Sequence, residues 1–264
     1  MSVSGHLSGR GAAANATIRA SLDELRLEGA YRFTHAETSP RHSHALGHLV
    51  LAATGVLSLL TDDGVWIAPG NRFTWVPAGF EHRHRAHGRT DMRIVHFEDS
   101  LVSPLPAVPT VLVATPLARE GVLSMTSSSS RSPASRDHLR RVIVDEIASA
   151  AQEPLHLPEL RDPRLQALAR HVEADLASPL SLAALGEVAG LQSRTLSRLF
   201  RQETGMGYRQ WRLQLRVHHA LVLLANGASV TDTAAACGWA STSQFIEQFS
   251  PLVGMTPGKY RRLS

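Results

Sequence analysis

The chain has 264 residues, of which 43% are hydrophobic and 19% are charged, and its formal net charge is +4. This composition is typical of a folded protein with room for two domains, and it argues against a disordered chain. No stretch reaches roughly 18 consecutive apolar residues, so neither a membrane span nor a membrane partner is expected. Residues 1–25 lack the apolar core of a secretory signal and are expected to form a flexible tail.

Cysteine content and charge distribution narrow the class of protein further. Cys237 is the single cysteine, so no internal disulfide can form and a cytoplasmic location is expected. Residues 179–264 carry nine basic and four acidic residues, whereas the rest of the chain carries 18 basic and 19 acidic residues. An excess of positive charge confined to the C-terminal part is typical of a region that binds a polyanion.

The region from about residue 30 to residue 115 shows short alternating runs separated by turn residues. The Asp63-Gly64 step lies between the apolar runs 56–60 and 65–67 and predicts a hairpin. Residues 92–97 predict a further strand. Together these patterns predict an all-β barrel or sandwich.

A polar, Ser-rich connector is predicted at about 124–136, and a helix follows it. Its apolar residues fall at helical spacing, which fits either a helix that packs on its own barrel or a dimerisation helix; they are Leu139, Val142, Ile143 and Ile147. From residue 162 onward the pattern is helical throughout, with Pro163 in a first turn and Pro179 beyond the end of that helix. The stripe expected to be buried is Leu165, Leu168, Val172 and Leu176.

Two segments each predict a helix-turn-helix unit, at about 181–202 and 229–250. In the first, a short helix ends at Gly190, where a positive φ allows a sharp turn. The helix after it has an apolar face at Leu196, Leu199 and Phe200 and leaves arginines and hydroxyls outward, as reading of the major groove requires. The outward residues are Arg194, Thr195, Ser197, Arg198, Arg201 and Gln202.

The second segment repeats the first. When Gly190 is aligned with Gly238, the pair Leu196 and Phe200 falls near Phe245 and Phe249, again four residues apart. A helical run at 208–225 separates the two segments, and at 1.5 Å per residue it is about 27 Å long. A spacer of this length would place two recognition helices roughly one DNA turn apart.

Residues 163–262 resemble the DNA-binding domain of the AraC/XylS family of transcriptional regulators. The matching positions include 196–200, 203–205, Arg216, 237–239, Phe245, Phe249, Gly254, 256–257 and 260–262. The resemblance implies base contacts from Arg194, Ser197 and Arg198 in the first unit, with Thr195 and Arg201 beside them. In the second unit it implies contacts from Thr242, Ser243, Ile246 and Glu247.

The second unit departs from the family pattern. No Lys or Arg occurs between Trp239 and Gly258, and Pro251 is expected to break the helix there. The first unit is therefore expected to dominate the affinity for DNA. Glu247 either accepts from a cytosine amino group or is simply solvated. Cys237 is expected to be a small buried core residue.

The strand region resembles a cupin barrel. The resemblance implies candidate metal ligands at His42, His44, His48 and His82, with His48 standing where metal cupins usually have a glutamate. Four imidazoles could hold zinc, nickel or iron, or they could instead line an effector pocket. His84 and His87 are expected in a loop, and His96 is expected to be packed on a strand.

The predicted fold therefore has two domains, an N-terminal all-β cupin-like barrel and a C-terminal all-α domain with two helix-turn-helix units joined by a long helix. The expected boundaries are a sensor domain at 26–120, a linker with the possible dimerisation helix at 121–160 and a DNA-binding domain at 161–264.

The predicted function is that of a sequence-specific regulator of transcription and not of an enzyme, with no cofactor expected apart from a possible divalent metal. Its expected partners are double-stranded DNA, a small effector, RNA polymerase if it is an activator, and a second copy of the chain. A metal-dependent cupin enzyme with a DNA-binding appendage is the alternative. A pure interaction module is a third hypothesis, disfavoured by the arginines of the first recognition helix.

Overall fold

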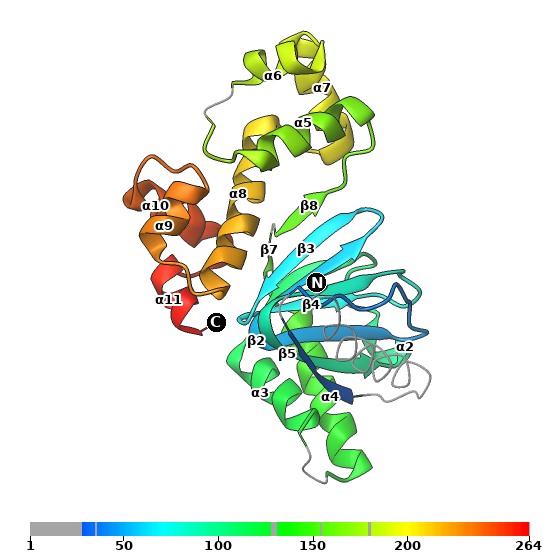
Figure 1. The fold of residues 1–264 in the computed structure, drawn as a ribbon. Helices are drawn as coiled ribbons and strands as arrows, with labels where there is room; N and C mark the ends of the chain where they lie inside the picture. The colour runs from blue at the N-terminus through cyan, green and yellow to red at the C-terminus, as the bar shows by residue number, and fades with distance from the viewer. Residues whose placement is uncertain (1–27, 35, 128–130, 154, 179–180, 264) are drawn as a thin grey trace, which may run out of the picture. The chain divides into compact units, whose positions relative to one another are not determined.

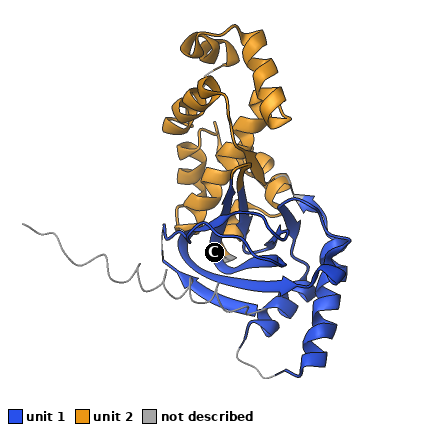
Figure 2. Ribbon diagram, turned by 90° about the vertical axis from the view of Figure 1, so that its right-hand side faces the viewer, with its two compact units in different colours: residues 1–61, 66–153 blue, residues 62–65, 154–264 orange. Residues whose placement is uncertain are grey.

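The computed structural model describes residues 28–34, 36–127, 131–153, 155–178 and 181–263 (Figure 1). These residues divide into two compact units, one formed by the chain up to residue 61 with 66–153, the other by 62–65 with 154–264 (Figure 2). The first unit contains a large β-sheet and the second is mainly helical, which confirms the two-part organisation. The tail predicted at 1–25 lies outside the described residues.

The first unit is built on one twisted sheet. Its strands are β1 (Glu28–Phe33), β2 (Gly47–Thr61), β3 (Gly64–Pro69), β4 (Arg72–Val76), β5 (Arg83–Phe97), β6 (Thr110–Val113) and β7 (Gln152–Glu153). Six of them are paired in the order β1-β5-β2-β4-β6-β7, and β3 pairs with β2. Within the described residues this order has two ends, so it does not close into the ring of strands that the predicted barrel would need.

β2 and β3 pair across the turn at the Asp63-Gly64 step, which confirms the predicted hairpin, and β5 confirms the strand at 92–97. The long strands β2 and β5 carry buried side chains on both faces of the sheet. Leu49 and Leu51 contribute to one core, whereas Val50 and Ala52 contribute to the other, because successive side chains of a strand point to opposite faces. The second core also contains Ala86 and Ile94 of β5. A residue of β5 in phase with Ala86 and Ile94, or a residue of β2 that precedes the register shift after Ala52 and is in phase with Val50, points to the same face as the second core.

Helices cover the face of the sheet that carries the first core. They are α2 (Asp99–Val102), α3 (Pro116–Met125) and α4 (Pro133–Ala148) (Figure 1). α4 is the helix predicted after the Ser-rich connector, and its Ile143, Val144 and Ile147 are buried in that core. The apolar stripe of α4 therefore packs within its own unit, and dimerisation through this helix stays a prediction.

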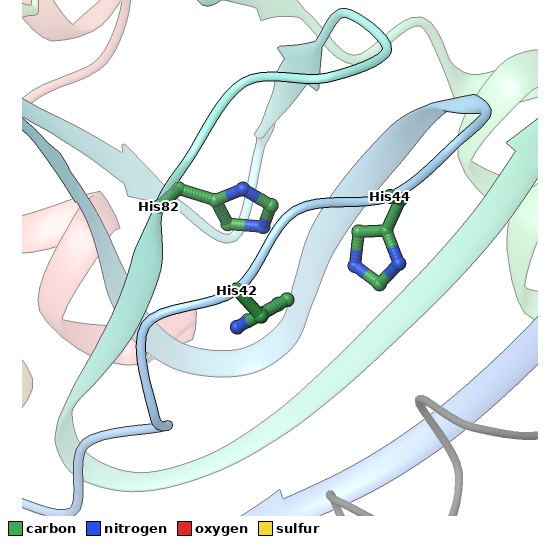
Figure 3. Close-up of side chains that lie close together, drawn as sticks. All are labelled: His42, His44 and His82. Atoms are coloured by element: carbon green, nitrogen blue, oxygen red, sulfur yellow. The ribbon is translucent and has the colours of Figure 1, made fainter.

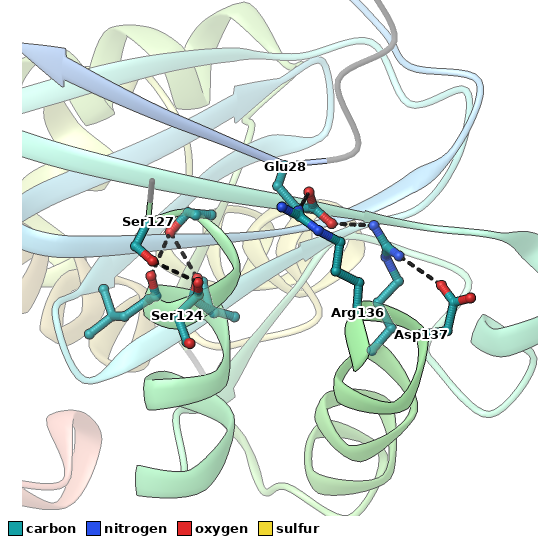
Figure 4. Close-up of polar contacts among 9 residues, drawn as sticks. Glu28, Ser124, Ser127, Arg136 and Asp137 are labelled. Carbon is teal, nitrogen blue, oxygen red and sulfur yellow. Dashed lines mark hydrogen bonds and ion pairs between the residues drawn. The ribbon is translucent and has the colours of Figure 1, made fainter. Parts of the chain in front are cut away.

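A network of charged side chains fastens α4 to β1 (Figure 4). The Glu28 carboxylate accepts hydrogen bonds from Arg136 and Arg140, and Arg140 also donates to Asp137 at 3.0 Å. Arg140 is only 6% exposed. Its charge is therefore compensated by two carboxylates rather than by water. At the end of α3, the Ser127 hydroxyl donates a hydrogen bond to the Ser124 carbonyl at 2.8 Å (Figure 4).

The second unit begins with β8 (His156–Pro158) and continues as helices. These are α5 (Pro163–Ala174), α6 (Leu182–Ala189), α7 (Ser193–Thr204), α8 (Tyr208–Ala225), α9 (Val230–Ala236), α10 (Thr242–Val253) and α11 (Pro257–Leu263). Asp162 caps α5 and Pro163 occupies its first turn, as predicted. The expected stripe of α5 and its continuation is buried at Leu165, Leu168, Val172 and Leu176. α8 spans the predicted spacer, and none of the described helices is both long and apolar enough to cross a bilayer.

The prediction that Pro251 breaks its helix is wrong. α10 runs through Pro251 to Val253. Proline removes one backbone donor, but here it stands in the last turn, so a single hydrogen bond to the Glu247 carbonyl is lost. The end of the helix is held by the buried Val253 and by Gly254. A φ of 71° at Gly254 lets its N–H donate to the Ser250 carbonyl at 2.8 Å.

Candidate nucleic-acid interface

The pair α6 and α7 is joined by a sharp turn. Gly190 adopts a left-handed conformation with φ of 64°, and the Leu191 N–H donates to the Gly186 carbonyl at 2.8 Å. Gly186 lies so close to this turn that a Cβ there would be 2.5 Å from the carbonyl oxygen of Leu191. Ser181 caps α6 by accepting from the Ala184 N–H. The two glycines therefore fix the angle between α6 and α7.

α7 has one buried face and one basic face. Leu196 and Phe200 have no exposed surface, and the Phe200 ring lies 5.5 Å from that of Tyr208 and 5.4 Å from that of Trp211, both of α8. These contacts orient α7, so the polar side chains on its other face project outward. Five of the predicted outward residues line a single surface depression, namely Arg194, Ser197, Arg198, Arg201 and Gln202. Thr195, half-buried, lies at the edge of the buried face.

The pair α9 and α10 repeats this construction. Gly238, with φ of 77°, follows α9, and a Cβ there would be 2.5 Å from Cα of Ala177. Ser241 caps α10 by accepting from the Gln244 N–H at 3.2 Å. Phe245 and Phe249 have no exposed surface, as is also true of Leu196 and Phe200 in α7. The predicted apolar face is therefore buried in the second helix of both pairs.

The outward face of α10 differs from that of α7 in charge. Ser243, Ile246 and Glu247 are exposed there and Thr242 is half-buried, whereas α7 presents three arginines. An exposed isoleucine beside a carboxylate offers no attraction to phosphate. The four residues predicted for the second unit thus lie on one face of α10, and this face lacks the positive charge that the outward face of α7 carries.

α8 connects the two pairs through its buried side. Trp211 packs on Phe200 of α7, and Arg216 donates to the Cys237 carbonyl at the end of α9. Cys237 itself is fully buried, which confirms its predicted core position. Burial lowers the pKa of Arg216 to about 10, so this arginine keeps its charge at neutral pH.

Glu203 is a residue whose role sequence reasoning missed. It lies near the C-terminal end of α7, and its carboxylate accepts from the backbone N–H groups of Arg161 and Asp162 at 2.8 Å and 2.9 Å. Arg161 in turn pairs with Asp63 at 3.0 Å. No periodic signal could have found this contact, because its partners are backbone groups about 40 residues away along the chain.

A comparison with known proteins assigns the class of this construction. A family described as a helix-turn-helix domain matches residues 185–263, which include both helix pairs except the first residues of α6. The fold and this match define a protein with a helix-turn-helix DNA-binding domain.

Relatives give the family. The HTH-type transcriptional regulator NimR of Escherichia coli K12 is 33% identical over 249 residues, covering 92% of this chain and 85% of its own. The HTH-type transcriptional regulator GlxA of Rhizobium meliloti is 35% identical over 103 residues, covering 39% of this chain and 32% of its own. A solved transcriptional regulator from Chromobacterium violaceum with an AraC-type DNA-binding domain has 30% identity and a TM-score of 0.36 over 38% of this chain and 90% of its own. The chain belongs to the AraC family of helix-turn-helix transcriptional regulators.

The first unit brings the predicted candidate metal ligands together. His42 and His82 form an antiparallel bridge, with N–H to carbonyl distances of 2.9 Å and 2.8 Å. Their rings and that of His44 lie close to one another, with ring centroids 4.3 Å apart for His42 and His82 (Figure 3). The His48 ring, with no exposed surface, lies 4.5 Å from that of His44.

Two further histidines join this group. The prediction that His84 and His87 lie in a loop is wrong, because both belong to β5, where exposed arginines alternate with the buried His84 and Ala86. That alternation over 83–86 was the available signal for a strand. His96 pairs directly with His48 across the sheet, and their ring centroids are 5.1 Å apart. His87 instead shares a hydrogen bond with Ser58 at 2.8 Å.

The shared environment keeps these imidazoles neutral at neutral pH. Burial, with repulsion from neighbouring histidines, lowers the pKa of His44 to about 3. Burial is also the main cause for His82, whose pKa falls to about 4, and it holds the pKa of His48 and His84 well below the usual value. Among the residues that the structure describes, neither ring nitrogen of the buried His48 has a hydrogen-bond partner. Each such group costs about 1–3 kcal/mol.

Proposed function

We propose that the protein binds specific DNA sites by inserting α7 into the major groove, with Arg194, Ser197 and Arg198 contacting base edges. The observation that carries this proposal is the two-sided character of α7. Its buried Leu196 and Phe200 fix the helix on the unit, while its arginines line one outward depression. Arginine donates two hydrogen bonds to O6 and N7 of guanine, which makes it the commonest reader of a specific base.

We propose further that both helix pairs act as helix-turn-helix units. The support is the repeat of the same buried face, Leu196 and Phe200 in α7 and Phe245 and Phe249 in α10. Because the outward face of α10 carries no arginine or lysine, the second unit contributes less to affinity than the first. Its contribution is through Thr242, Ser243, Ile246 and backbone amides.

The test is fluorescence anisotropy with duplex DNA from upstream of the protein's own gene, with a scrambled duplex for comparison, over a series of salt concentrations. We expect the natural duplex to bind well over tenfold more tightly than the scrambled one. Arg198→Ala should lose about 1–3 kcal/mol of that preference. Arg141→Ala, which removes an exposed arginine from α4, is the matched control and should leave the preference unchanged.

Equal binding of both duplexes, driven by salt alone and unaltered by Arg198→Ala, would overturn the proposal. Such a result means that the arginines only neutralise phosphates.

The first unit is proposed as the sensor, a cupin-like domain that binds a small effector. The histidine-bearing face of its sheet supports this role, since it holds buried imidazole nitrogens that form no hydrogen bond with any described residue. An effector can shift the DNA-binding unit only by binding its two states with different affinity. A homodimer, contact with RNA polymerase and a cytoplasmic location stay predictions. The relatives are named as transcriptional regulators, which does not favour the alternative of a metal-dependent enzyme.

A further inference from the structure

Six histidines of the first unit form one continuous cluster, which we call the histidine cluster. Its members are His42, His44, His48, His82, His84 and His96. They come from parts of the chain up to 54 positions apart, and only four of them belong to the cupin pattern. Three overlapping triads of this cluster have ligand atoms within 4.8 Å of one another: His42, His44 and His82; His44, His48 and His96; His48, His82 and His84.

The sheet itself gathers these side chains. His48 of β2 and His84 and His96 of β5 are in phase with Val50, Ala86 and Ile94, so they share the face of the second core. The bridge between His42 and His82 brings the remaining rings over that face. Backbone hydrogen bonds between the strands therefore hold these histidines next to one another, independently of the side-chain rotamers.

Hydrogen bonds to the backbone prepare two of the rings for coordination. The Nδ1–H of His42 donates to the Pro40 carbonyl at 2.7 Å, and the Nδ1–H of His82 donates to the Phe80 carbonyl at 2.8 Å. A carbonyl can only accept, so each ring is fixed with its proton on Nδ1 and a lone pair on Nε2. Metal-binding histidines are oriented in this way by a backbone carbonyl. The buried Nε2 of His82 has no hydrogen-bond partner within the described part of the chain.

The deepest rings also have lone pairs that the protein does not use. His48 is fully buried, and no described residue forms a hydrogen bond with either of its nitrogens or with the Nε2 of the buried His84. His42 and His44 are half-buried, so this part of the cluster is in reach of solvent. A buried group of unsatisfied nitrogens fits an ion better than it fits an apolar core.

We propose that the histidine cluster binds one divalent transition-metal ion through imidazole nitrogens. The three triads contain no carboxylate and no thiolate, so they suit zinc, nickel, cobalt or copper and not the oxygen-preferring magnesium or calcium. His44, His48 and His82 each belong to two triads and are the ligands on which binding depends most. The site is independent of the DNA-binding role proposed above.

The test uses the full-length, untagged chain, stripped with a chelator and dialysed against Zn²⁺, Ni²⁺ or Co²⁺. We expect one ion per chain to be retained after gel filtration, visible bands of Co²⁺ with nitrogen ligands, and a rise in the melting temperature that the ion alone produces. Magnesium should give none of these. His44→Gln and His82→Gln should each weaken binding at least about tenfold.

His138→Gln is the matched control, because His138 is exposed on α4 and lies outside the cluster. It should bind the ion as the unchanged chain does. Circular dichroism of each metal-free variant checks that it folds. Because His44 is half-buried whereas His82 is buried, His44→Gln should disturb folding less than His82→Gln. The proposal is overturned if no ion is retained, or if folded His44→Gln and His82→Gln retain it as tightly as His138→Gln.

Discussion

The guanidinium of Arg216 lies over the indole of Trp239, with its central carbon 4.2 Å from the ring centroid. The same guanidinium donates from Nε to the Cys237 carbonyl. One side chain of α8 thus holds the end of α9 and the turn into α10, whereas Trp211 of the same helix packs on Phe200 of α7. A cation stacked on an aromatic ring and bonded to a carbonyl thus adds a polar anchor to the buried apolar face of the second pair.

Replacement of Arg216 is therefore expected to weaken the second unit. Arg216→Leu removes the stacking and leaves the Cys237 carbonyl without its donor, and it should lower the free energy of unfolding by about 2 kcal/mol. Arg216→Lys keeps the charge but not the planar group, and should recover only part of the loss. Urea unfolding followed by tryptophan fluorescence measures both, with Arg209→Leu, an exposed change on the same helix, as control. Equal stability of Arg216→Leu and Arg209→Leu would contradict this role.

The carboxylate of Glu203 should keep the start of α5 attached to α7. Glu203→Ala removes the acceptor for the N–H groups of Arg161 and Asp162. The free energy of unfolding should fall by about 1 kcal/mol. Hydrogen exchange at these two amides should become faster, and Glu203→Gln, which retains an acceptor oxygen, should restore part of the protection. The interpretation fails if the exchange rates of both amides are the same in Glu203→Ala as in the unchanged protein.

The two glycines of the first turn should respond differently to alanine. At Gly190 the surrounding space is open and only the left-handed φ is unfavourable. Gly190→Ala should therefore cost about 1–2 kcal/mol of stability and keep DNA binding. At Gly186 a Cβ would collide with the Leu191 backbone, so Gly186→Ala must alter the angle between α6 and α7 and should abolish the preference for specific DNA. Melting curves and anisotropy separate the two effects, and a Gly186→Ala variant with full preference would show that the turn tolerates the change.

The charge of Glu247 should oppose DNA binding. Glu247→Gln removes an exposed carboxylate from the outward face of α10. Affinity should therefore rise about two- to fivefold at low salt for both natural and scrambled duplexes, and the gain should shrink as salt is added. Asp145→Asn, an exposed change on α4, is the control. A fall in affinity confined to the natural duplex would mean instead that Glu247 accepts a hydrogen bond from a base.

Local patterns were sufficient to predict the helical unit. The spacing of Leu196 and Phe200, its repeat at Phe245 and Phe249, and the glycines that follow α6 and α9 are all expressed within short stretches of chain. Helical periodicity and glycine turns are local properties, so these helices, their buried faces and the basic outward face of α7 could be predicted from the order of residues alone. The resemblance of these residues to a family pattern was sufficient to predict that the unit binds DNA.

Features that depend on the pairing of distant segments could not be predicted in this way. His84 and His96 entered the histidine cluster because β5 pairs with β2 in a register that no local pattern specifies. Pro251 was accommodated because buried Val253 and Gly254 hold the helix end after the lost hydrogen bond. Glu203 and Arg216 form hydrogen bonds with backbone groups of residues distant in the sequence. Every residue type has a backbone carbonyl, and all but proline have an N–H, so no sequence pattern predicts such a contact. Contacts between distant segments are set by the packing of whole elements, and for that reason they appear only when the chain is folded.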